Sequence, residues 1–453
     1  MNISEIAMAA KAASIHLAAV DTETKNKALA EIAKALKQHS TEIISANNQD
    51  IAESEKNNLA APLLKRLKFD QGKLNETCAG IESLIKLDDP VGRILRATEL
   101  DKGLDLYQVT CPIGVIGVIF ESRPDALVQI STLCLKSGNT VLLKGGSEAA
   151  RTNKILAKII AEATCQGSAF SGQRTADGGA GIPIGWIQLL ETRQDVAAML
   201  ALDEQIDLII PRGSNEFVRY IMNNTNIPVL GHAEGICHVY VDGEADLEMA
   251  IKIVVDSKCQ YVAVCNAAET LLVDEAIAKK FLPMIKNALE AKGVDSTSSP
   301  QVELRGCEKT RAIIEAKPAT EQDWATEYLD YIISIKVVDG VDEAISHINR
   351  YSSAHTDAIV TANKDTANKF TDFVDSANVF WNCSTRFSDG YRYGLGAEVG
   401  VSTNKIHARG PVGLEGLVIY KWKLYATGQI VADYAEGKKK FTHKRIQRSP
   451  MES

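Results

Sequence analysis

Two short apolar runs rich in β-branched residues constrain this chain more than any other feature. Ile113–Phe120 reads IGVIGVIF and Val141–Lys144 reads VLLK, with a helical stretch, Leu127–Lys136, between them. Runs that are apolar on both sides suit strands buried on both faces of a parallel sheet. Strand, helix and strand in this order make a βαβ unit, so the sequence predicts an open α/β sheet.

The same rhythm returns further along the chain. Ile206–Ile210, Ile227–Leu230 and Cys237–Val241 predict further strands, and helices alternate with strands again after Asp246. The first 90 residues have helical periodicity, which ends at Asp89-Pro90. We therefore expect two successive α/β domains rather than one.

Three segments fall outside this rhythm. Leu100–Cys111 and Leu417–Tyr425 have β character without alternating helices, and Lys438–Lys440 begins a basic tail that we expect to be frayed. Cys165–Gly181 is rich in Gly, Ser and Ala, and it predicts an exposed loop insertion without chemistry.

Charge and cysteine usage narrow the class of function. The net charge of −8 over 453 residues argues against a nucleic-acid binder built on a basic surface. The nine cysteines are odd in number and have no C-x-x-C spacing, so neither a zinc framework nor a secreted disulfide framework is expected, and no metal. Without a signal peptide or an apolar run of membrane-spanning length, the expected location is the cytoplasm, away from membranes.

A nucleotide site is indicated where buried strands end. Lys144 closes one apolar run, and Gly145 and a helix start at Ser147-Glu148 follow it; Arg212-Gly213-Ser214 repeats the arrangement after the next apolar strand. Ligands of open α/β sheets bind beyond the carboxyl ends of strands, and helix N-termini favour anions. An ordinary helix cap with a surface lysine would explain either place alone, and the G-x-G-x-x-G fingerprint is absent.

A second candidate is the thiol of Cys265, which ends an apolar approach and is followed by Asn266 and two alanines. Small neighbours leave room for a substrate at the sulfur, and an adjacent amide can donate to an oxyanion. A buried structural thiol is the alternative reading, and Cys237 and Cys259 are the nearest rivals.

The third candidate is the glycine-rich loop of residues 382–413. Long loops without periodicity in compact domains tend to be functional, and its arginines suit bidentate binding of carboxylate or phosphate. An exposed polar linker is the alternative. The arginines are Arg386, Arg392 and Arg409.

Four motifs resemble the gamma-glutamyl phosphate reductase (glutamate-5-semialdehyde dehydrogenase) family of the aldehyde dehydrogenase superfamily. They read PIGVIGVIFESRPDAL, SGNTVLLKGGSEA, CNAAETLLV and STRFSDGYRYGLGAEVGVSTNKIHARGPVGLE, and the similarity runs from about Ile6 to about Gly428. The resemblance implies an α/β aldehyde dehydrogenase-like fold with two open α/β domains and a β oligomerisation arm. It assigns residues 1–235, with the arm segment 100–111, to a cofactor domain, 236–412 to a catalytic domain, 413–430 to the oligomerisation arm and 431–453 to a polar basic tail.

The resemblance also implies a reaction. The Cys265 thiolate, with a depressed pKa, would attack L-glutamyl 5-phosphate and expel phosphate, and hydride from NADPH would reduce the thioester to L-glutamate 5-semialdehyde in the second step of proline biosynthesis. Glutamate 5-kinase would be the upstream partner, and the β segments would build a homodimer or homotetramer. Lys144 favours the 2′-phosphate of NADPH, whereas Glu148 disfavours it. The resemblance to the family therefore decides for NADPH over NADH.

Site roles follow position by position from the resemblance. Asn266 would assist the Cys265 oxyanion. In hydrolytic relatives a glutamate activates water, and its place here falls on His232, two residues from Glu234. A reductase that uses phosphate needs no water-activating base, so His232 receives no catalytic role. The expected cofactor-binding residues are Lys144, Gly145, Ser147, Glu148, Gly213, Ser214 and Glu398, and the expected substrate-binding residues are Ser122, Arg123, Arg386 and Arg409.

Two other functions stay open at this point. A hydrolytic NAD-dependent aldehyde dehydrogenase would need a base near Cys265 and would act without phosphate. A catalytically silent oligomeric homologue is disfavoured because Cys265, Lys144 and Glu398 are all present.

Overall fold

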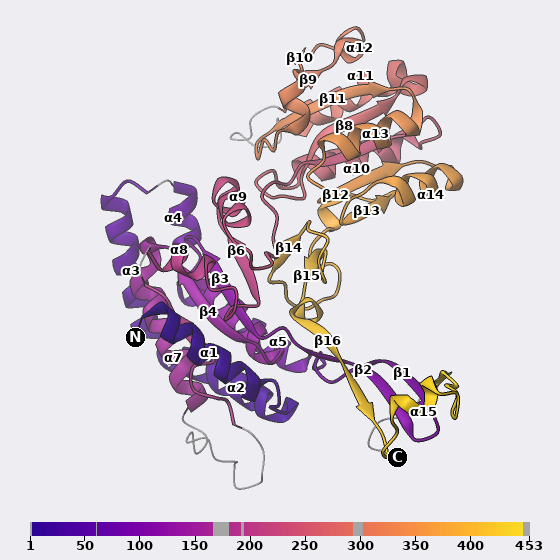
Figure 1. Cartoon of the computed structure of the whole chain (residues 1–453). Coiled ribbons are helices and arrows are strands. Elements are labelled where there is room, and N and C mark those ends of the chain that lie inside the picture. The colour runs from indigo at the N-terminus through magenta and orange to yellow at the C-terminus, as the bar shows by residue number, and fades with distance from the viewer. Residues whose placement is uncertain (1, 60, 166–180, 192–193, 293–301, 447–453) are drawn as a thin grey trace. The chain divides into compact units, whose positions relative to one another are not determined.

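The computed structural model describes residues 2–59, 61–165, 181–191, 194–292 and 302–446, and it divides into two compact units. Unit 1 comprises residues 1–213, 220–229 and 412–453, and unit 2 comprises residues 214–219 and 230–411. The elements of each unit are labelled in Figure 1. The predicted loop insertion at 165–181 lies almost wholly outside the described residues.

Unit 1 begins with the helices that the periodicity predicts. Asp21 and Asp70 cap their helices by accepting the backbone N–H groups of Thr24 and Lys73, and Asn2 makes a capping box. These helices are α1 (Ile3–Leu17), α2 (Thr22–Gln38), α3 (Ser40–Lys56), α4 (Ala61–Leu67) and α5 (Gln71–Lys86).

The parallel sheet of unit 1 has the strand order β5-β4-β3-β6. Its central strands β3 (Val115–Phe120) and β4 (Thr140–Gly145) are buried at every position, as the apolar runs predict. Helix α1 packs on this sheet, and so do α6 and α7, the helices that follow β3 and β4. Helices α2, α3 and α5 pack on the outer side of α6 and α7. The remaining elements are α6 (Pro124–Lys136), η1 (Ser147–Ala149), α7 (Ala150–Cys165), β5 (Ile187–Leu189), α8 (Gln194–Leu200), β6 (Leu208–Arg212) and α9 (Asn215–Asn223).

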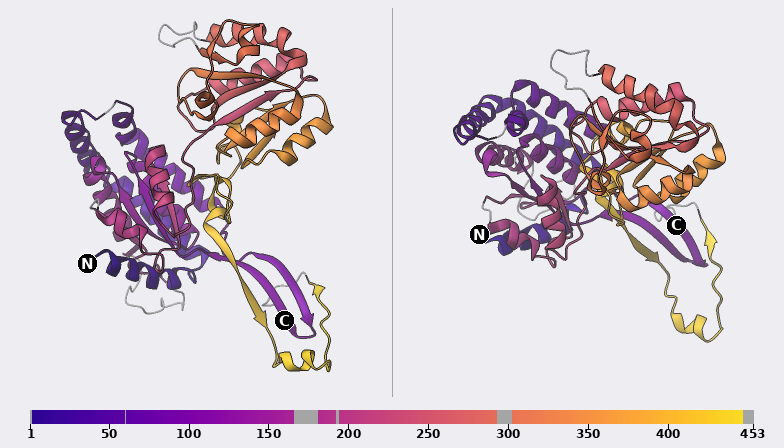
Figure 2. Two further views of the ribbon diagram at one scale, coloured as in Figure 1. Left: turned by 45° about the horizontal axis from the view of Figure 1, so that its top comes forward. Right: turned by 90° about the horizontal axis from the view of Figure 1, so that it is seen from above.

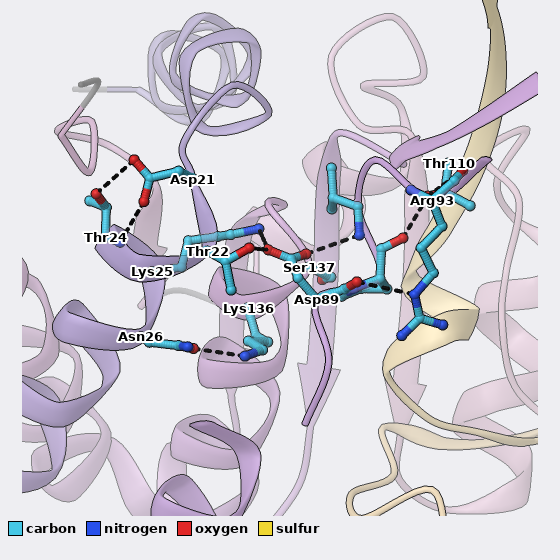
Figure 3. Close-up of polar contacts among 12 residues, drawn as sticks. Asp21, Thr22, Thr24, Lys25, Asn26, Asp89, Arg93, Thr110, Lys136 and Ser137 are labelled. Carbon is cyan, nitrogen blue, oxygen red and sulfur yellow. Dashed lines mark hydrogen bonds and ion pairs between the residues drawn. The ribbon is translucent and has the colours of Figure 1, made fainter. Parts of the chain in front are cut away.

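A buried ion pair joins the helical layer of unit 1 to the loop that follows α5. Lys25 is 1 % exposed, and its Nζ lies 2.5 Å from Asp89 Oδ2, which also accepts from the Thr22 hydroxyl at 2.7 Å. The other carboxylate oxygen accepts the backbone N–H of Val91, and the Asp89 carbonyl accepts from the Arg93 guanidinium (Figure 3). These residues form what we call the Asp89 cluster, so the Asp89-Pro90 break is an anchoring point as well as a helix end.

Unit 2 is a doubly wound sheet with all its described strand pairs parallel, in the order β10-β9-β11-β8-β7-β12-β13. One apolar cluster joins one face to α10 and α11, and another joins Tyr240, Leu272 and Ile359 to α13 and α14. The elements are β7 (Cys237–Val241), α10 (Leu247–Cys259), β8 (Ala268–Asp274), α11 (Glu275–Lys292), β9 (Glu303–Gly306), α12 (Glu308–Arg311), β10 (Lys317–Pro318), η2 (Glu321–Ala325), β11 (Ile332–Val338), α13 (Gly340–Tyr351), β12 (Thr356–Val360), α14 (Lys364–Phe373), β13 (Asn378–Trp381), η3 (Thr385–Phe387), β14 (Gly400–Ser402) and β15 (Gly410–Val412).

The β segments outside the α/β rhythm form an antiparallel sheet with the order β16-β2-β1-β17 (Figure 2). The predicted segment Leu100–Cys111 covers the last two residues of β1, the turn at Lys102-Gly103 and most of β2, whereas residues 94–99 of β1 precede it. We call this sheet the arm. Its strands, with two short helical elements near them in the chain, are β1 (Ile94–Asp101), β2 (Leu104–Pro112), η4 (Leu414–Leu417), β16 (Val418–Tyr425), α15 (Val431–Ala435) and β17 (Lys444–Arg445).

Two expectations are wrong in this part of the chain. The basic tail is not frayed as far as residue 446, because β17 pairs with β1 and the Tyr434 hydroxyl donates to Asp101 at 2.9 Å. Ile227–Leu230 forms no strand; Val229 makes only an isolated bridge to Ile209 beside β6. None of the described helices is long and apolar enough to cross a membrane.

Candidate active site

The amino ends of three neighbouring strands in unit 2 carry the reactive side chains. Cys265 precedes β8, His232 precedes β7 and His355 precedes β12, and these strands lie side by side in the order β8-β7-β12. Because parallel strands place their amino ends along one edge, residues far apart in the sequence meet there. One ligand atom from each of the three side chains lies within 4.8 Å of the other two. We call this group the thiol site.

The backbone of Cys265 is held by contacts that leave its side chain half-buried. The buried Cys237 thiol donates to the Cys265 carbonyl at 3.2 Å. A Cβ atom on Gly235 would lie 2.1 Å from that carbonyl oxygen and 2.3 Å from the Cys265 Cα, far inside any real contact. Only glycine at position 235 lets β7 approach the turn that carries the thiol.

Asn266 fixes the other side of this turn. Its side chain is buried, and the side-chain amide nitrogen donates to the Ser388 carbonyl at 2.7 Å, while the backbone carbonyl of Asn266 accepts from the Thr385 hydroxyl. One amide N–H is therefore used for structure, and the second remains for the oxyanion role that the sequence predicts.

Both imidazoles have one nitrogen oriented by a neighbour. His232 Nδ1 lies 2.9 Å from the Val401 carbonyl, which can only accept, so Nδ1 carries a proton and Nε2 carries a lone pair in the neutral ring. His355 Nδ1 lies 2.8 Å from the Thr356 hydroxyl, and its buried Nε2 has no hydrogen-bond partner in the part of the chain that the structure describes. Burial, and then the neighbouring His232, hold the pKa of His355 well below the ordinary histidine value, so this ring is neutral.

The rival thiol of Cys237 is unsuited to nucleophilic chemistry. It is fully buried, and burial raises its pKa well above the ordinary cysteine value, with the charge of Asp357 adding to the effect. The thiolate is the nucleophilic form, so the geometry favours the half-exposed Cys265 over Cys237.

Arg386 is the predicted anion-binding arginine that lies close to the thiol site. Its guanidinium interacts electrostatically with Cys265, and burial and then the like charge of Arg392 lower its pKa. Its Nε donates to the Gln260 side chain at 3.0 Å, which leaves its other donors for an anion.

The other predicted residues of unit 2 lie apart from this group or have partners of their own. Arg409 donates to the Thr403 carbonyl and is paired with Asp375 at 3.2 Å. Glu398 accepts the backbone N–H of Gly390 at 2.7 Å. Ser214 is the first residue of unit 2, immediately after Gly213.

Unit 1 brings a second set of predicted residues together at the carboxyl edge of its sheet. The chain enters at β3, continues to β4 and β5 on one side, and returns to β6 on the other, so β3 and β6 mark the topological switch point where such sheets bind ligands. Lys144 is the buried penultimate residue of β4, Ser122 and Arg123 follow β3, and Gly213 follows β6.

The turn after β4 brings Ser122 and Glu148 together. Ser122 has a positive φ of 45°, and its N–H and hydroxyl donate to Glu148 at 2.5 and 2.8 Å. A Cβ atom on Gly146 would lie 2.1 Å from a Glu148 carboxylate oxygen, so a side chain at position 146 would require the flexible end of Glu148 to move. Lys144, Gly145, Ser147 and Glu148 thus form one group, and Ser122 joins it.

Sequence reasoning missed His355 and gave His232 no role. Each precedes a buried apolar run, but the candidates were sought at the carboxyl ends of strands. The signal that was available is the order of the chain itself: polar residues just before three apolar runs become neighbours if those runs pair in parallel.

Comparisons with known proteins agree with this arrangement. The sequence model of the aldehyde dehydrogenase family matches residues 1–323. The chain is 64 % identical over 446 residues to the gamma-glutamyl phosphate reductase of Pelotomaculum thermopropionicum, covering 98 % of each chain. The crystal structure of gamma-glutamyl phosphate reductase from Thermotoga maritima is similar with a TM-score of 0.88 at 41 % identity, over 95 % of this chain and 100 % of that one.

A more distant structure shares the fold alone. It is an engineered glycolyl-CoA reductase with bound NADP+, which matches with a TM-score of 0.60 at 13 % identity over 93 % of this chain and 96 % of that one.

Proposed function

The chain belongs to the aldehyde dehydrogenase family, among its gamma-glutamyl phosphate reductases, and from this premise we propose that it reduces L-glutamyl 5-phosphate to L-glutamate 5-semialdehyde and phosphate. The observation that carries the proposal is the half-buried Cys265 thiol, held on a turn by Gly235 beside two imidazoles and Arg386. The product would serve proline biosynthesis, as its second step.

The first step is an acyl transfer to the thiol. The Cys265 thiolate attacks the γ-acyl carbon, a C–S bond forms, the C–O bond to phosphate breaks and phosphate leaves. The Cys265 backbone N–H and the second amide N–H of Asn266 are the donors proposed to stabilise the oxyanion of the tetrahedral state. Arg386 supplies positive charge for the phosphate or the α-carboxylate, and Arg123 and Arg409 are the further candidates.

The second step reduces the thioester to a thiohemiacetal. NADPH supplies the hydride for this step when it is bound. The residues proposed to hold it are Lys144, whose ammonium suits a ribose or a 2′-phosphate, and Glu148, whose carboxylate suits ribose hydroxyls. Gly145, Ser147, Gly213, Ser214 and Glu398 complete the proposed set. The thiohemiacetal then collapses, which releases the aldehyde and restores the thiol.

We further propose that the arm makes the protein a homodimer or a homotetramer. The edge strand β16 exposes Tyr420, Trp422 and Leu424, each about half exposed. A Trp422→Glu variant should therefore lower the mass in solution measured by light scattering, and an unchanged mass would remove the arm from the interface. None of the cysteines whose side chains are described is in a disulfide, which suits a reducing compartment such as the cytoplasm.

The reaction run backwards tests the function. The purified protein is given pyrroline-5-carboxylate, which is in equilibrium with the semialdehyde, and NADP+, with and without phosphate. NADP+ reduction that requires phosphate is expected, because phosphate must release the acyl group from Cys265. Turnover that is indifferent to phosphate would instead indicate a hydrolytic aldehyde dehydrogenase. No turnover with NADP+ or with NAD+ would indicate a silent homologue.

A further inference from the structure

We propose that the thiol site binds a thiophilic divalent cation of the Zn²⁺ class through the Cys265 sulfur and one imidazole nitrogen each of His232 and His355. Among the described residues, this is the one group of three histidine, cysteine or acidic side chains whose ligand atoms come close enough to share an ion. Binding at this site would reversibly block the nucleophile. That consequence rests on the proposed function, whereas the binding itself does not.

The donor set suits the ion. Zn²⁺ is borderline soft and is bound in proteins by thiolate and imidazole, with three protein ligands and an open fourth position in sites that exchange ligands. With Zn–S near 2.3 Å and Zn–N near 2.0 Å, neighbouring ligand atoms of a tetrahedral site lie roughly 3.5 Å apart. The present separations of up to 4.8 Å must therefore shrink by roughly 1 Å. Cys265 lies on a turn and is half-buried, as is His232, so side-chain rotation can supply this movement.

The neighbours of the two histidines resemble the outer shell of a metal site. Ligating histidines donate their second N–H to a carbonyl, carboxylate or other acceptor, which fixes the tautomer and the ring direction. His232 meets this condition through the Val401 carbonyl, and His355 can meet it through the Thr356 hydroxyl. In both cases Nε2 is the ligand atom.

The unpartnered nitrogen of His355 is an independent indication. A buried polar atom without a hydrogen bond costs free energy, and native structures seldom keep one without a use. His355 has no measurable exposure, and its Nε2 has no partner among the described residues. A ligand on this nitrogen would satisfy it.

The nearby cation sets the strength of the site. Arg386 interacts electrostatically with Cys265, so its charge opposes a second cation there. We therefore expect weaker affinity than that of a structural zinc site, and an ion that a chelator removes. On binding, the Cys265 thiol loses its proton to solvent and the S–metal bond forms, so the sulfur lone pair is no longer available to attack an acyl phosphate.

The test uses Cd²⁺ as a probe, because cadmium thiolates absorb in the ultraviolet. The full chain is titrated with Cd²⁺ in the absence of substrate and nucleotide, and the spectrum of the Cys265→Ala variant is subtracted to remove other thiols. We expect a difference band that saturates at one equivalent per chain and that Zn²⁺ abolishes by competition. No difference band at one equivalent would overturn the proposal.

Histidine variants separate this site from a lone cysteine. His232→Gln and His355→Gln should each weaken Cd²⁺ binding at least tenfold. His407→Gln, an exposed histidine of the same unit, and Cys383→Ala, a thiol of the same unit, should leave it unchanged. Circular dichroism of each variant confirms its folding. Unchanged affinity in both His232→Gln and His355→Gln would show that the sulfur binds alone, and would also overturn the proposal.

An activity measurement completes the design. Zn²⁺ should inhibit the phosphate-dependent reverse reaction with the dissociation constant found from its competition with Cd²⁺. A chelator should restore the activity. If the protein binds Cd²⁺ as expected but lacks that reaction, the metal site stands and the proposed function fails. If the reaction is present but the difference band is absent, the reverse holds.

Discussion

The Asp89 cluster and the thiol site each gather polar side chains within one unit, but they treat those side chains in opposite ways. At the Asp89 cluster, both carboxylate oxygens have partners, from Lys25, Thr22 and the Val91 N–H. At the thiol site, two buried atoms have no hydrogen-bond partner among the described residues. They are Nε2 of His355 and the side-chain oxygen of Asn266. A satisfied cluster holds elements together, whereas unsatisfied donors and acceptors are available for chemistry.

The backbone follows the same division. The Asp89 cluster sits where a helix ends and needs no unusual approach. The thiol site depends on Gly235, which passes so close to Cys265 that no side chain fits between them. Changes in the Asp89 cluster should therefore lower the free energy of unfolding, whereas changes at the thiol site should lower activity. Four experiments test this contrast.

The largest effect is expected from Cys265→Ala. Removing the nucleophile should lower kcat of the reverse reaction by at least about 10⁴-fold, because no other group can form the acyl enzyme. Nucleotide binding, measured by fluorescence titration, and the midpoint of urea unfolding should stay unchanged. Retention of substantial turnover would show that another thiol is the nucleophile.

The next effect concerns the Asp89 cluster. Lys25→Met leaves Asp89 buried without its cation, and it should destabilise unit 1 by about 3 kcal/mol, read from urea unfolding. The matched control is Lys27→Met, since Lys27 pairs with Glu23 on the surface and both are about three-quarters exposed. That control should change stability by less than about 0.5 kcal/mol. Equal effects in the two variants would mean that the burial of the pair is unimportant.

Gly235→Ala tests the approach to the thiol. The added methyl group must displace the Cys265 backbone, and a displacement of the nucleophile by about 1 Å should lower kcat roughly 10²-fold. Gly243→Ala, where the nearest atoms lie 3.5 Å from the added carbon, should leave kcat unchanged. Full activity in Gly235→Ala would show that the turn adapts, and the geometric account of Cys265 would be wrong.

The smallest effect concerns acid. Burial, and then the charges of His238 and Lys336, lower the pKa of His347 to about 2 from an ordinary 6.5. Below pH 6.5 the imidazole is therefore protonated in the unfolded chain but not in the folded chain. The free energy of unfolding has its full value above pH 6.5 and decreases as the pH falls below it. Unit 2 should lose roughly 2 kcal/mol between pH 6.5 and 5 from this residue. Urea unfolding against pH measures it, and His347→Leu should flatten the slope; an equal slope in that variant would refute the assignment.

The sequence predicted the sheets well and the site only in part. The runs at β3 and β4 are apolar on both faces, so their burial follows from composition alone. The predicted β segment begins at Leu100 and so omits residues 94–99 of β1, and it includes the short polar turn at Lys102-Gly103. The strand expected at Ile227–Leu230 failed because apolar residues there fill the space beside β6 without pairing along it.

The thiol site shows why the rest was out of reach. Cys265 was found from its small neighbours, which is local information. His355 lies 90 residues further along the chain (355 − 265 = 90), and it becomes a neighbour only because β12 pairs with β7 rather than with β11. Strand order is set by tertiary packing, so no local pattern could supply it.

The pairing of β17 with β1 determines how the arm can grow. β17 pairs with Thr98 and Glu99 on one margin of that sheet, and β16 forms the other margin, on which no further strand lies among the described residues. A ribbon open at both margins can add copies without limit, as in a fibre. A ribbon sealed on one side can pair only once, and two such ribbons meeting margin to margin consume each other's free hydrogen-bonding groups. The pairing of β17 with β1 therefore favours a finite form of the assembly proposed above over a fibre.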